Sequence, residues 1–265
     1  SIQGYEGEGK MKIEYQEFPV NFSDGTVVLL RKPNYFIVDW KYGLPHPELQ
    51  ISPRIAPPMI GLGMLEAISQ KDILANADPE DTNNDGISGK ANQVWDIKDN
   101  EVSLGRFGWK AGEPNIRQQS AKAFNVDIGI STPLVNTPWG DCSSKQQKCR
   151  QALHGSTSGQ NRFEISPEAM DKLVFYSRNL GVPARRDIND PQVLAGKKLF
   201  YDIGCADCHR PKFVTKRLAD RPEQSFQLIW PYTDLLLHDM GERLADNRPE
   251  GLATGKEWRT APLWG

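Results

Sequence analysis

The residues best suited to chemistry lie together in the segment GCADCHRP, at positions 204–211. Cys205 and Cys208 are separated by two residues, and His209 follows the second cysteine directly. This is the attachment pattern of c-type haem, in which two thiols add to the vinyl groups of the porphyrin and the adjacent imidazole ligates the iron. The spacing therefore predicts a covalently bound haem with His209 as one axial ligand.

Two other kinds of site use the same residue types. A Cys-x-x-Cys redox pair usually lies near a βαβ pattern, whereas here a helix is expected directly before Cys205. A zinc site would need one or two more ligands, which His238 could partly supply. Three rare residues at fixed places argue against a chance match. Haem is therefore the preferred interpretation, and zinc binding or thiol redox chemistry are the alternatives.

The haem iron also needs a sixth ligand or an open face. The segment LLLHDMG, at 235–241, offers Met240 and His238. Thioether ligation raises the reduction potential and suits electron transfer, so Met240 is preferred and His238 is the alternative. Both side chains could instead simply pack in a leucine-rich segment. The preceding stretch AGKKLFYDIGCADCH is similar to the first helix of cytochrome c domains, in which Gly196 would allow a close helix crossing and Phe200 would pack at the haem edge.

A second candidate site is the loop DTNNDGISGKAN, which begins at Asp81. Asp81, Asn83 and Asp85 occupy positions 1, 3 and 5 of an EF-type calcium loop, and Ile87 occupies position 7, which supplies a backbone carbonyl. Asn92 replaces the bidentate Glu of position 12. The loop predicts either a calcium site or a polar turn that binds no ion.

The other two cysteines, Cys142 and Cys149, lie in GDCSSKQQKCR. If Cys205 and Cys208 carry haem, only these two remain to pair with each other. Haem c is attached outside the cytoplasm, where disulfides persist. We therefore expect a local disulfide and a periplasmic or otherwise extracytoplasmic protein, and two free thiols are the alternative.

Charge and hydropathy limit the class of partner. The chain has 265 residues and a net charge of −2, which argues against nucleic acid as the main partner. No apolar run approaches the ~20 residues of a membrane-spanning helix. Residues 184–221 contain nine Lys or Arg and five Asp or Glu, a net of +4. This stretch is either an ordinary solvated surface or a docking surface for a small redox donor protein of cytochrome or cupredoxin type.

The elements that must position these residues follow from periodicity and from start signals. Residues 11–40 alternate in polarity around a turn at Asp24-Gly25 and predict short strands. Proline and capping signals predict helices from Pro114 to about Asp127, from Pro167 to Gly181, and from Pro191 into the cysteines. With 23 glycines and 19 prolines, much loop is expected. We predict a mainly α fold with an appended N-terminal β-rich segment.

Several long stretches together resemble the bacterial di-haem oxidoreductase family, whose members are described as peroxidase-like and are sometimes labelled thiol oxidoreductases. The stretches are ISPRIAPPMIGLGMLEAI, LGRFGWKAGEPNIRQQSAKAF, VPARRDINDPQV, GCADCH, YTDLLLHDMGERLADNRPEG and EWRTAPLWG. The family is similar to di-haem cytochrome c peroxidases. Those enzymes have two cytochrome c-like domains with one haem in each and a calcium ion between them, and the second haem passes electrons to the first, where peroxide is reduced.

The resemblance also implies roles for three residues of GWKAGEPNIRQQSAKAFNVDIG. Trp109 would relay electrons between the haems, Gln119 would be a polar residue of the haem pocket, and Asp127 would be the acid/base that moves a proton between peroxide oxygens. The match is loose, because Asp127 stands where the peroxidases have Glu and Ile128 stands where they have Met.

On this resemblance, residues 1–183 are the remainder of a first, peroxidase-like domain, and residues 184–265 begin a second cytochrome c-like domain. Because no second Cys-x-x-Cys-His is present, we expect the first attachment site to lie upstream of Ser1 and more chain to follow Gly265. The predicted function is to pass electrons from an external donor to a peroxide as part of a di-haem enzyme. The alternatives are a non-enzymatic periplasmic electron-transfer cytochrome and a metal-binding module with no redox role.

Overall fold

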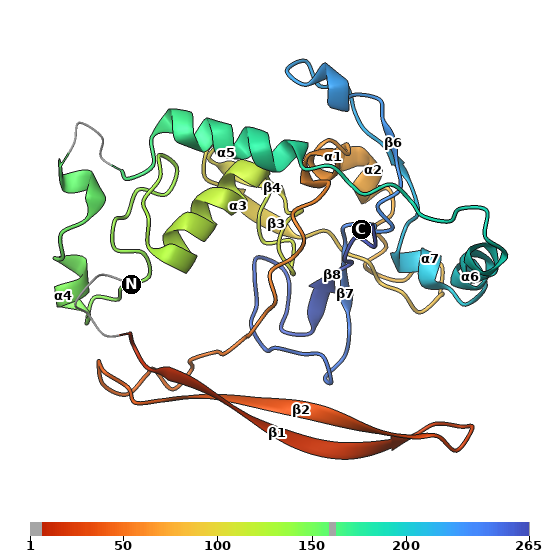
Figure 1. Ribbon diagram of the computed structural model, residues 1–265, viewed down its shortest axis with the longest axis horizontal. Helices are drawn as coiled ribbons and strands as arrows, with labels where there is room; N and C mark the ends of the chain where they lie inside the picture. Colours follow the sequence, from red (N-terminus) through yellow and green to blue (C-terminus); the bar gives the residue numbers. More distant parts are fainter. Residues whose placement is uncertain (1–6, 159–162, 265) are drawn as a thin grey trace. The chain divides into compact units, whose positions relative to one another are not determined.

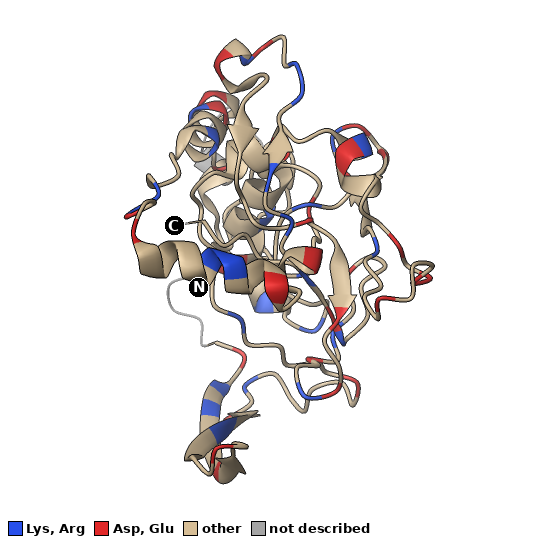
Figure 2. Ribbon diagram, turned by 90° about the vertical axis from the view of Figure 1, so that its right-hand side faces the viewer, with Lys and Arg blue, Asp and Glu red and all other residues tan. Residues whose placement is uncertain are grey.

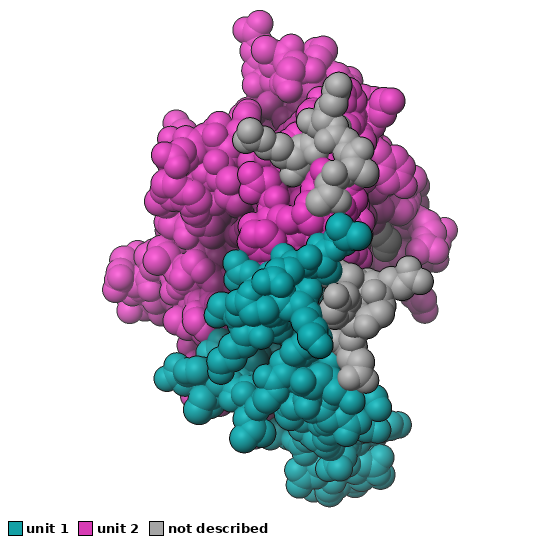
Figure 3. Space-filling view, turned by 90° about the vertical axis from the view of Figure 1, so that its left-hand side faces the viewer, with its two compact units in different colours: residues 1–55, 141–153 teal, residues 56–140, 154–265 magenta. Residues whose placement is uncertain are grey.

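A computed structural model describes residues 7–158 and 163–264 and divides the chain into two compact units. Unit 1 comprises residues 1–55 and 141–153, and unit 2 comprises residues 56–140 and 154–265 (Figure 3). All of the candidate haem and peroxidase residues belong to unit 2. The expected domain division at 183/184 falls inside unit 2 and stays a prediction.

Unit 1 is built around a long β-hairpin (Figure 1). Strands β1 (Lys10–Asn21) and β2 (Val27–Val38) pair antiparallel from Lys10↔Val38 to Asn21↔Val27. The turn uses Gly25 at φ 85°, and Asp24 accepts a hydrogen bond from the Thr26 N–H. The expected β-rich segment is therefore present. Unit 1 also contains α4 (Gln147–Arg150) and the predicted disulfide between Cys142 and Cys149.

The helices of unit 2 are short. They are α1 (Leu62–Glu66), α2 (Gln70–Leu74), α3 (Ile116–Lys122), the π-helical turn η1 (Ala123–Asp127), the 3-10 turn η2 (Gly155–Ser158), α5 (Pro167–Asn179), α6 (Pro191–Asp202), α7 (Cys205–Cys208) and the 3-10 turn η3 (Pro222–Gln224). Ser166 and Asp190 cap α5 and α6 as expected. Helix α3 differs from its prediction, because the Asn115 side chain caps it by accepting from the Gln118 N–H, so Pro114 precedes the cap.

The strands of unit 2 form three separate two-stranded sheets. The pairs are β3 (Gln93–Asp96) with β4 (Glu101–Leu104), β5 (Phe213–Val214) with β6 (Leu228–Ile229), and β7 (Leu237–Asp239) with β8 (Glu257–Arg259). No sheet in the described residues has a third strand, so tertiary packing of loops and short helices must supply most of the stability.

The prediction of a mainly α fold is wrong. The structure has 24% helix and 19% strand, and the longest helix in its described part, α5, has 13 residues. The physical reason is that, apart from α5 and α6, the described α-helices run for only four to seven residues before a turn or loop ends them. Much of the main core is therefore contributed by short elements and loops, as at Leu65, Ile73, Leu235 and Leu236. A second cluster joins α3 to α5, which pack side by side (Figure 1).

Candidate functional site

The predicted attachment motif forms one helical turn at the end of α6. Gly204 turns the chain with φ 83°, and α7 then places Cys205 and Cys208 three residues apart on a single turn. Residues at this spacing share a face of a helix, so the two sulfurs point to the same side. Among the described residues these are the two cysteines outside the disulfide, and both are half-buried. Both thiols are therefore available to one ligand.

His209 is held in the form that a metal ligand requires. Its Nδ1 lies 2.8 Å from the carbonyl oxygen of Tyr232. Because a carbonyl oxygen can only accept, Nδ1 carries a proton, and in the neutral ring this leaves the lone pair on Nε2. The ring of Phe200 packs edge-on against both His209 and Tyr232, with centroids 6.3 and 5.5 Å apart. The structure thus brings together three of the predicted haem residues and Phe200.

Helix α6 leaves its apolar side chains uncovered. None of its described residues is buried, and Leu194 is 51% exposed. Together with Trp230 and Ile188, Val193 and Leu194 line a shallow cavity of about 430 Å³. Gly196 makes no close crossing, because nothing lies within 4 Å of where its Cβ would be, so this detail of the cytochrome likeness is wrong here. Two thiols, an imidazole nitrogen and an exposed apolar helix face fit a porphyrin.

The two candidates for the sixth ligand lie in different surroundings. His238 is buried at 8% exposure, and its Nδ1 lies 3.8 Å from Cys208 Sγ. Its Nε2 lies 2.8 Å from the Asp234 carboxylate. Burial disfavours the charged ring, but Asp234 and Cys208 outweigh it and raise the pKa of His238 to about 10. Met240 is 49% exposed. The structure brings His238 to the motif, and the role of Met240 stays a prediction.

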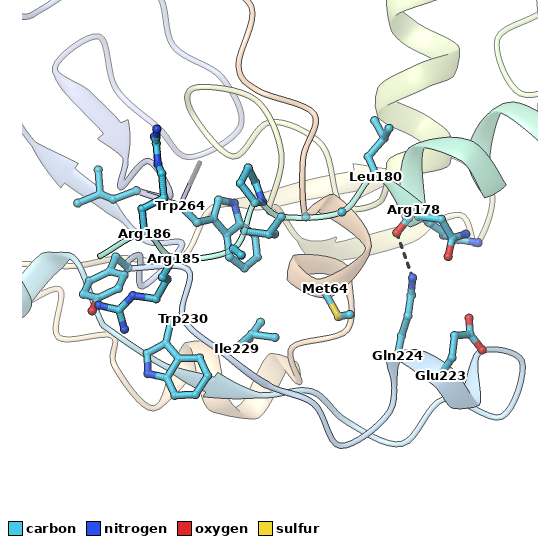
Figure 4. Close-up of a pocket in the computed structure, with 18 residues that line it drawn as sticks. Met64, Arg178, Leu180, Arg185, Arg186, Glu223, Gln224, Ile229, Trp230 and Trp264 are labelled. Atoms are coloured by element: carbon cyan, nitrogen blue, oxygen red, sulfur yellow. Dashed lines mark hydrogen bonds between the residues drawn. The ribbon is translucent and has the colours of Figure 1, made fainter. Parts of the chain in front are cut away.

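A larger cavity of about 840 Å³ lies beside Tyr232 (Figure 4). Trp230, Trp264, Ile229 and Met64 supply much of its apolar lining. At one side, Gln224 donates a hydrogen bond to the carbonyl of Arg178. Three arginines, Arg178, Arg185 and Arg186, and one acid, Glu223, also line the cavity. The guanidinium of Arg185 lies 5.9 Å from the centroid of the Tyr232 ring. Such a lining suits a mostly apolar group that carries negative charges.

The three residues carried over from the peroxidases are only partly brought together. Trp109 lies half-buried in the loop after β4, and Gln119 lies on α3. The Oε1 of Gln119 is buried without a hydrogen-bond partner and lies 3.8 Å from where a Cβ on Gly108 would be. Gln119 therefore faces the loop that carries Trp109. Asp127 is exposed at the end of η1, and its role stays a prediction.

Two buried charged residues near Trp109, Lys110 and Arg259, were missed by sequence reasoning. Lys110 is fully buried, and its Nζ lies 2.8 Å from Asp246 and 4.5 Å from the ring centroid of Trp258. Arg259 donates from Nε to the carbonyl of Gly108. Burial lowers the pKa of Arg259 to about 10, although the negative charge of Asp234 opposes that shift. Lysine and arginine are ordinarily surface residues, so nothing in their spacing signalled this.

The candidate calcium loop is folded around its acidic side chains. Asp81 accepts from the Asp85 N–H at 3.0 Å, Asp85 accepts from the Ile87 N–H at 2.8 Å, and Asn83 donates to Asp85 at 2.9 Å. Asn92 turns away, because its buried amide bonds Lys110, Glu250 and Leu252. Within residues 7–158 and 163–264, no three His, Cys, Asp or Glu side chains are grouped to hold a metal ion. Calcium binding stays a prediction.

Comparison with known proteins agrees with the motif. The family model described as di-haem oxidoreductase, putative peroxidase, matches residues 2–265. No curated protein and no solved structure matches the chain. No helix in the described part of the chain is long and apolar enough to cross a membrane. Because the match covers nearly the whole chain, the protein belongs to the di-haem oxidoreductase family and is a haem-dependent oxidoreductase.

Proposed function

We propose that this di-haem oxidoreductase binds a haem c through Cys205 and Cys208, with His209 as an axial ligand, and that the full enzyme uses electrons from an external donor to reduce a peroxide. The observation that carries the proposal is the hydrogen bond of His209 Nδ1 to Tyr232, at 2.8 Å. It leaves Nε2 as a ligand beside two thiols on one helical turn. The family supports haem redox chemistry, and peroxide as substrate is our inference.

When bound, the haem would supply one-electron redox chemistry. The chain's own residues would fix its place: the two cysteines tether it, Tyr232 orients the His209 ring, and the apolar side of α6 excludes water. Arg185 and Arg186 are placed to balance the carboxylates of such a group, because both line the cavity next to Tyr232. Met240 is the proposed sixth ligand, and His238 is the alternative.

On the peroxide side, Gln119 has a buried Oε1 without a partner, which could accept a hydrogen bond from a peroxide O–H. We assign Trp109 as the electron relay because it is half-buried in the adjoining loop. Asp127 would move the proton between peroxide oxygens. Its exposure means that it could exchange protons directly with water.

A non-enzymatic electron carrier is the second candidate. The buried His238 lies next to Cys208, and a second strong ligand would leave the iron no open position for substrate. The two functions differ in one measurement. Peroxide turnover by the full-length protein supports the enzyme, whereas a reducible haem without turnover supports the carrier.

The donor we propose is a small cytochrome or cupredoxin outside the cytoplasm. The disulfide between Cys142 and Cys149 supports an oxidising compartment. Helix α6 exposes Lys197 and Lys198, close in sequence to the motif, although Figure 2 shows basic and acidic residues interspersed over the chain. A donor that docks here should bind more weakly as salt is added, because screening weakens exposed charges.

The decisive experiment is expression with a cytochrome c maturation system, followed by intact mass and an absorption spectrum. The unmodified chain should gain the mass of one haem and show the bands of haem c. The Cys205→Ala/Cys208→Ala variant should gain neither. Its matched control is Cys142→Ser/Cys149→Ser, which removes the other pair and should keep the haem. A mass equal to the bare polypeptide for the unmodified chain would rule out the assignment.

A further inference from the structure

A continuous row of side chains connects the attachment motif with Trp109. Cys208 contacts His238, at 3.8 Å. His238 on β7 is the direct cross-strand partner of Trp258 on β8. Directly opposed residues of an antiparallel pair project to the same face, with Cβ atoms ~4.5–5.5 Å apart. The Trp258 ring then packs edge-on against Trp109, with centroids 6.4 Å apart.

The hydrogen bond of Trp258 keeps the indole proton in place if the ring loses an electron. Its Nε1–H donates to the backbone carbonyl of Leu244, at 2.9 Å. A peptide carbonyl is a very weak base, so it holds the indole proton in place but cannot take it. An oxidised Trp258 would therefore remain a radical cation and return to its starting state when it receives an electron.

Lys110 places a fixed positive charge against this ring. Its Nζ lies 4.5 Å from the Trp258 centroid and is held there by Asp246 and by the carbonyl of Thr254, at 2.8 and 2.7 Å. A cation over the ring face is attracted by the neutral indole and repelled by an oxidised one. Lys110 therefore makes Trp258 harder to oxidise.

We propose that Trp258 carries single electrons between a haem at the Cys205/Cys208 motif and Trp109, and that Lys110 sets the energy of this step. In the step, Trp258 gives one electron to a one-electron oxidant on the Trp109 side and receives one from the reduced iron. No bond forms or breaks, and the indole keeps its proton. The inference rests on the proposed function, since it requires a haem at the motif.

A ruthenium polypyridyl photo-oxidant attached to Thr254→Cys tests the pathway. Thr254 is exposed, and its carbonyl accepts from Lys110. Because the four native cysteines are in the disulfide or bound to haem, the new thiol is the one that reacts. After maturation and reduction, a laser flash in the presence of an electron-accepting quencher generates Ru(III). The bleach of the reduced haem band then gives the rate at which the haem supplies an electron.

In this labelled protein, Trp258→Phe should slow haem oxidation about tenfold, equal to a barrier increase of ~1.4 kcal/mol. Trp258→Tyr should recover part of the rate, because tyrosine can be oxidised whereas phenylalanine cannot. The matched control is Trp95→Phe, which removes an exposed tryptophan outside both the row and the proposed haem cavities and should leave the rate unchanged. Equal rates for Trp258→Phe and Trp95→Phe would overturn the proposal.

The role of Lys110 is tested with Lys110→Met/Asp246→Asn, which removes both buried charges together so that neither is left unpaired. This pair should speed haem oxidation about tenfold, because the repulsion at Trp258 is gone. Lys110→Arg keeps the charge and should keep the rate. An unchanged or lower rate in the double variant would refute the assignment of Lys110. Haem content, measured by mass and spectrum beforehand, separates these outcomes from a failure of the proposed function.

Discussion

The predicted attachment motif and the β7–β8 pair lie in the same compact unit, but they differ in which kinds of side chain they expose and bury. Helix α6 before the motif exposes its apolar side chains, whereas β7 and β8 bury charged ones, including His238 and Arg259. The buried charges have partners within the chain, such as Asp234 for His238. On α6, Val193, Leu194 and Leu199 stay 39%, 51% and 57% exposed. The chain itself therefore satisfies its buried charges, whereas the exposed side of α6 is where the proposed haem would lie.

The largest effect should come from breaking a buried pair. Lys110→Met removes the buried cation that pairs with the Asp246 carboxylate, and breaking a buried ion pair in this way typically costs ~3–5 kcal/mol in the free energy of unfolding. The control is Lys198→Met on α6, which removes an exposed lysine paired with Asp202 and should cost under ~0.5 kcal/mol. Urea denaturation measures both. Similar losses of unfolding free energy for the two variants would contradict the distinction between a buried ion pair beside β8 and an exposed one on α6.

A second test concerns the loop at 81–87. Like α6, it is largely exposed and is a place where a bound group, here calcium, is predicted. If Asp81, Asn83 and Asp85 bind calcium, the ion at 100 times its dissociation constant should add ~2.7 kcal/mol to the free energy of unfolding. Asp81→Asn/Asp85→Asn should abolish that gain. Thermal melts with calcium and with a chelator provide the measurement, and identical melts would show that the loop is only a polar turn.

Leu194→Ala tests whether the apolar side of α6 contacts a bound haem or only solvent. Without haem, Leu194 is 51% exposed, and its loss should change the unfolding free energy by under ~0.5 kcal/mol. With haem bound, the same change should cost about 1–2 kcal/mol, because the side chain is then covered. Equal effects in the two forms would mean that the apolar side of α6 does not contact the haem.

The smallest effect should come from pH. Burial raises the pKa of Glu257. Hydrogen bonds from Lys90 and from the Thr254 N–H lower it by more than burial raises it, so the folded-state pKa lies below the usual 4.5. A depressed carboxyl pKa stabilises the fold above pH 4.5, and this contribution is lost as pH falls through the folded-state pKa. Glu257→Gln should remove this part of the acid sensitivity, worth under ~1 kcal/mol. Denaturation midpoints between pH 6 and pH 3 should therefore converge for the two proteins, and parallel curves would contradict the assignment.

Signals that depend on neighbours in sequence were read correctly. The turn at Asp24-Gly25 and the caps at Ser166 and Asp190 are local hydrogen bonds, and the structure has each of them. The fold class was predicted wrongly because short apolar stretches do not reveal whether they will continue as a helix or stop. Helix α6 was identified, but its expected crossing at Gly196 was not found, since a crossing depends on what packs against the helix.

The sequence by itself determined which residues the motif offers to a ligand. Two thiols at fixed local spacing need only one helical turn to share a face, and α7 (Cys205–Cys208) forms that turn with His209 directly after it as the C-cap. Only the tertiary structure decided which distant residues contact the motif and the tryptophan row beside it. Tyr232 orients His209, His238 reaches Cys208, and Lys110 lies over Trp258, although these partners are 23, 30 and 148 residues apart. Contacts at such separations depend on how the chain packs, because no periodic pattern along a sequence specifies which buried charge will lie against which ring.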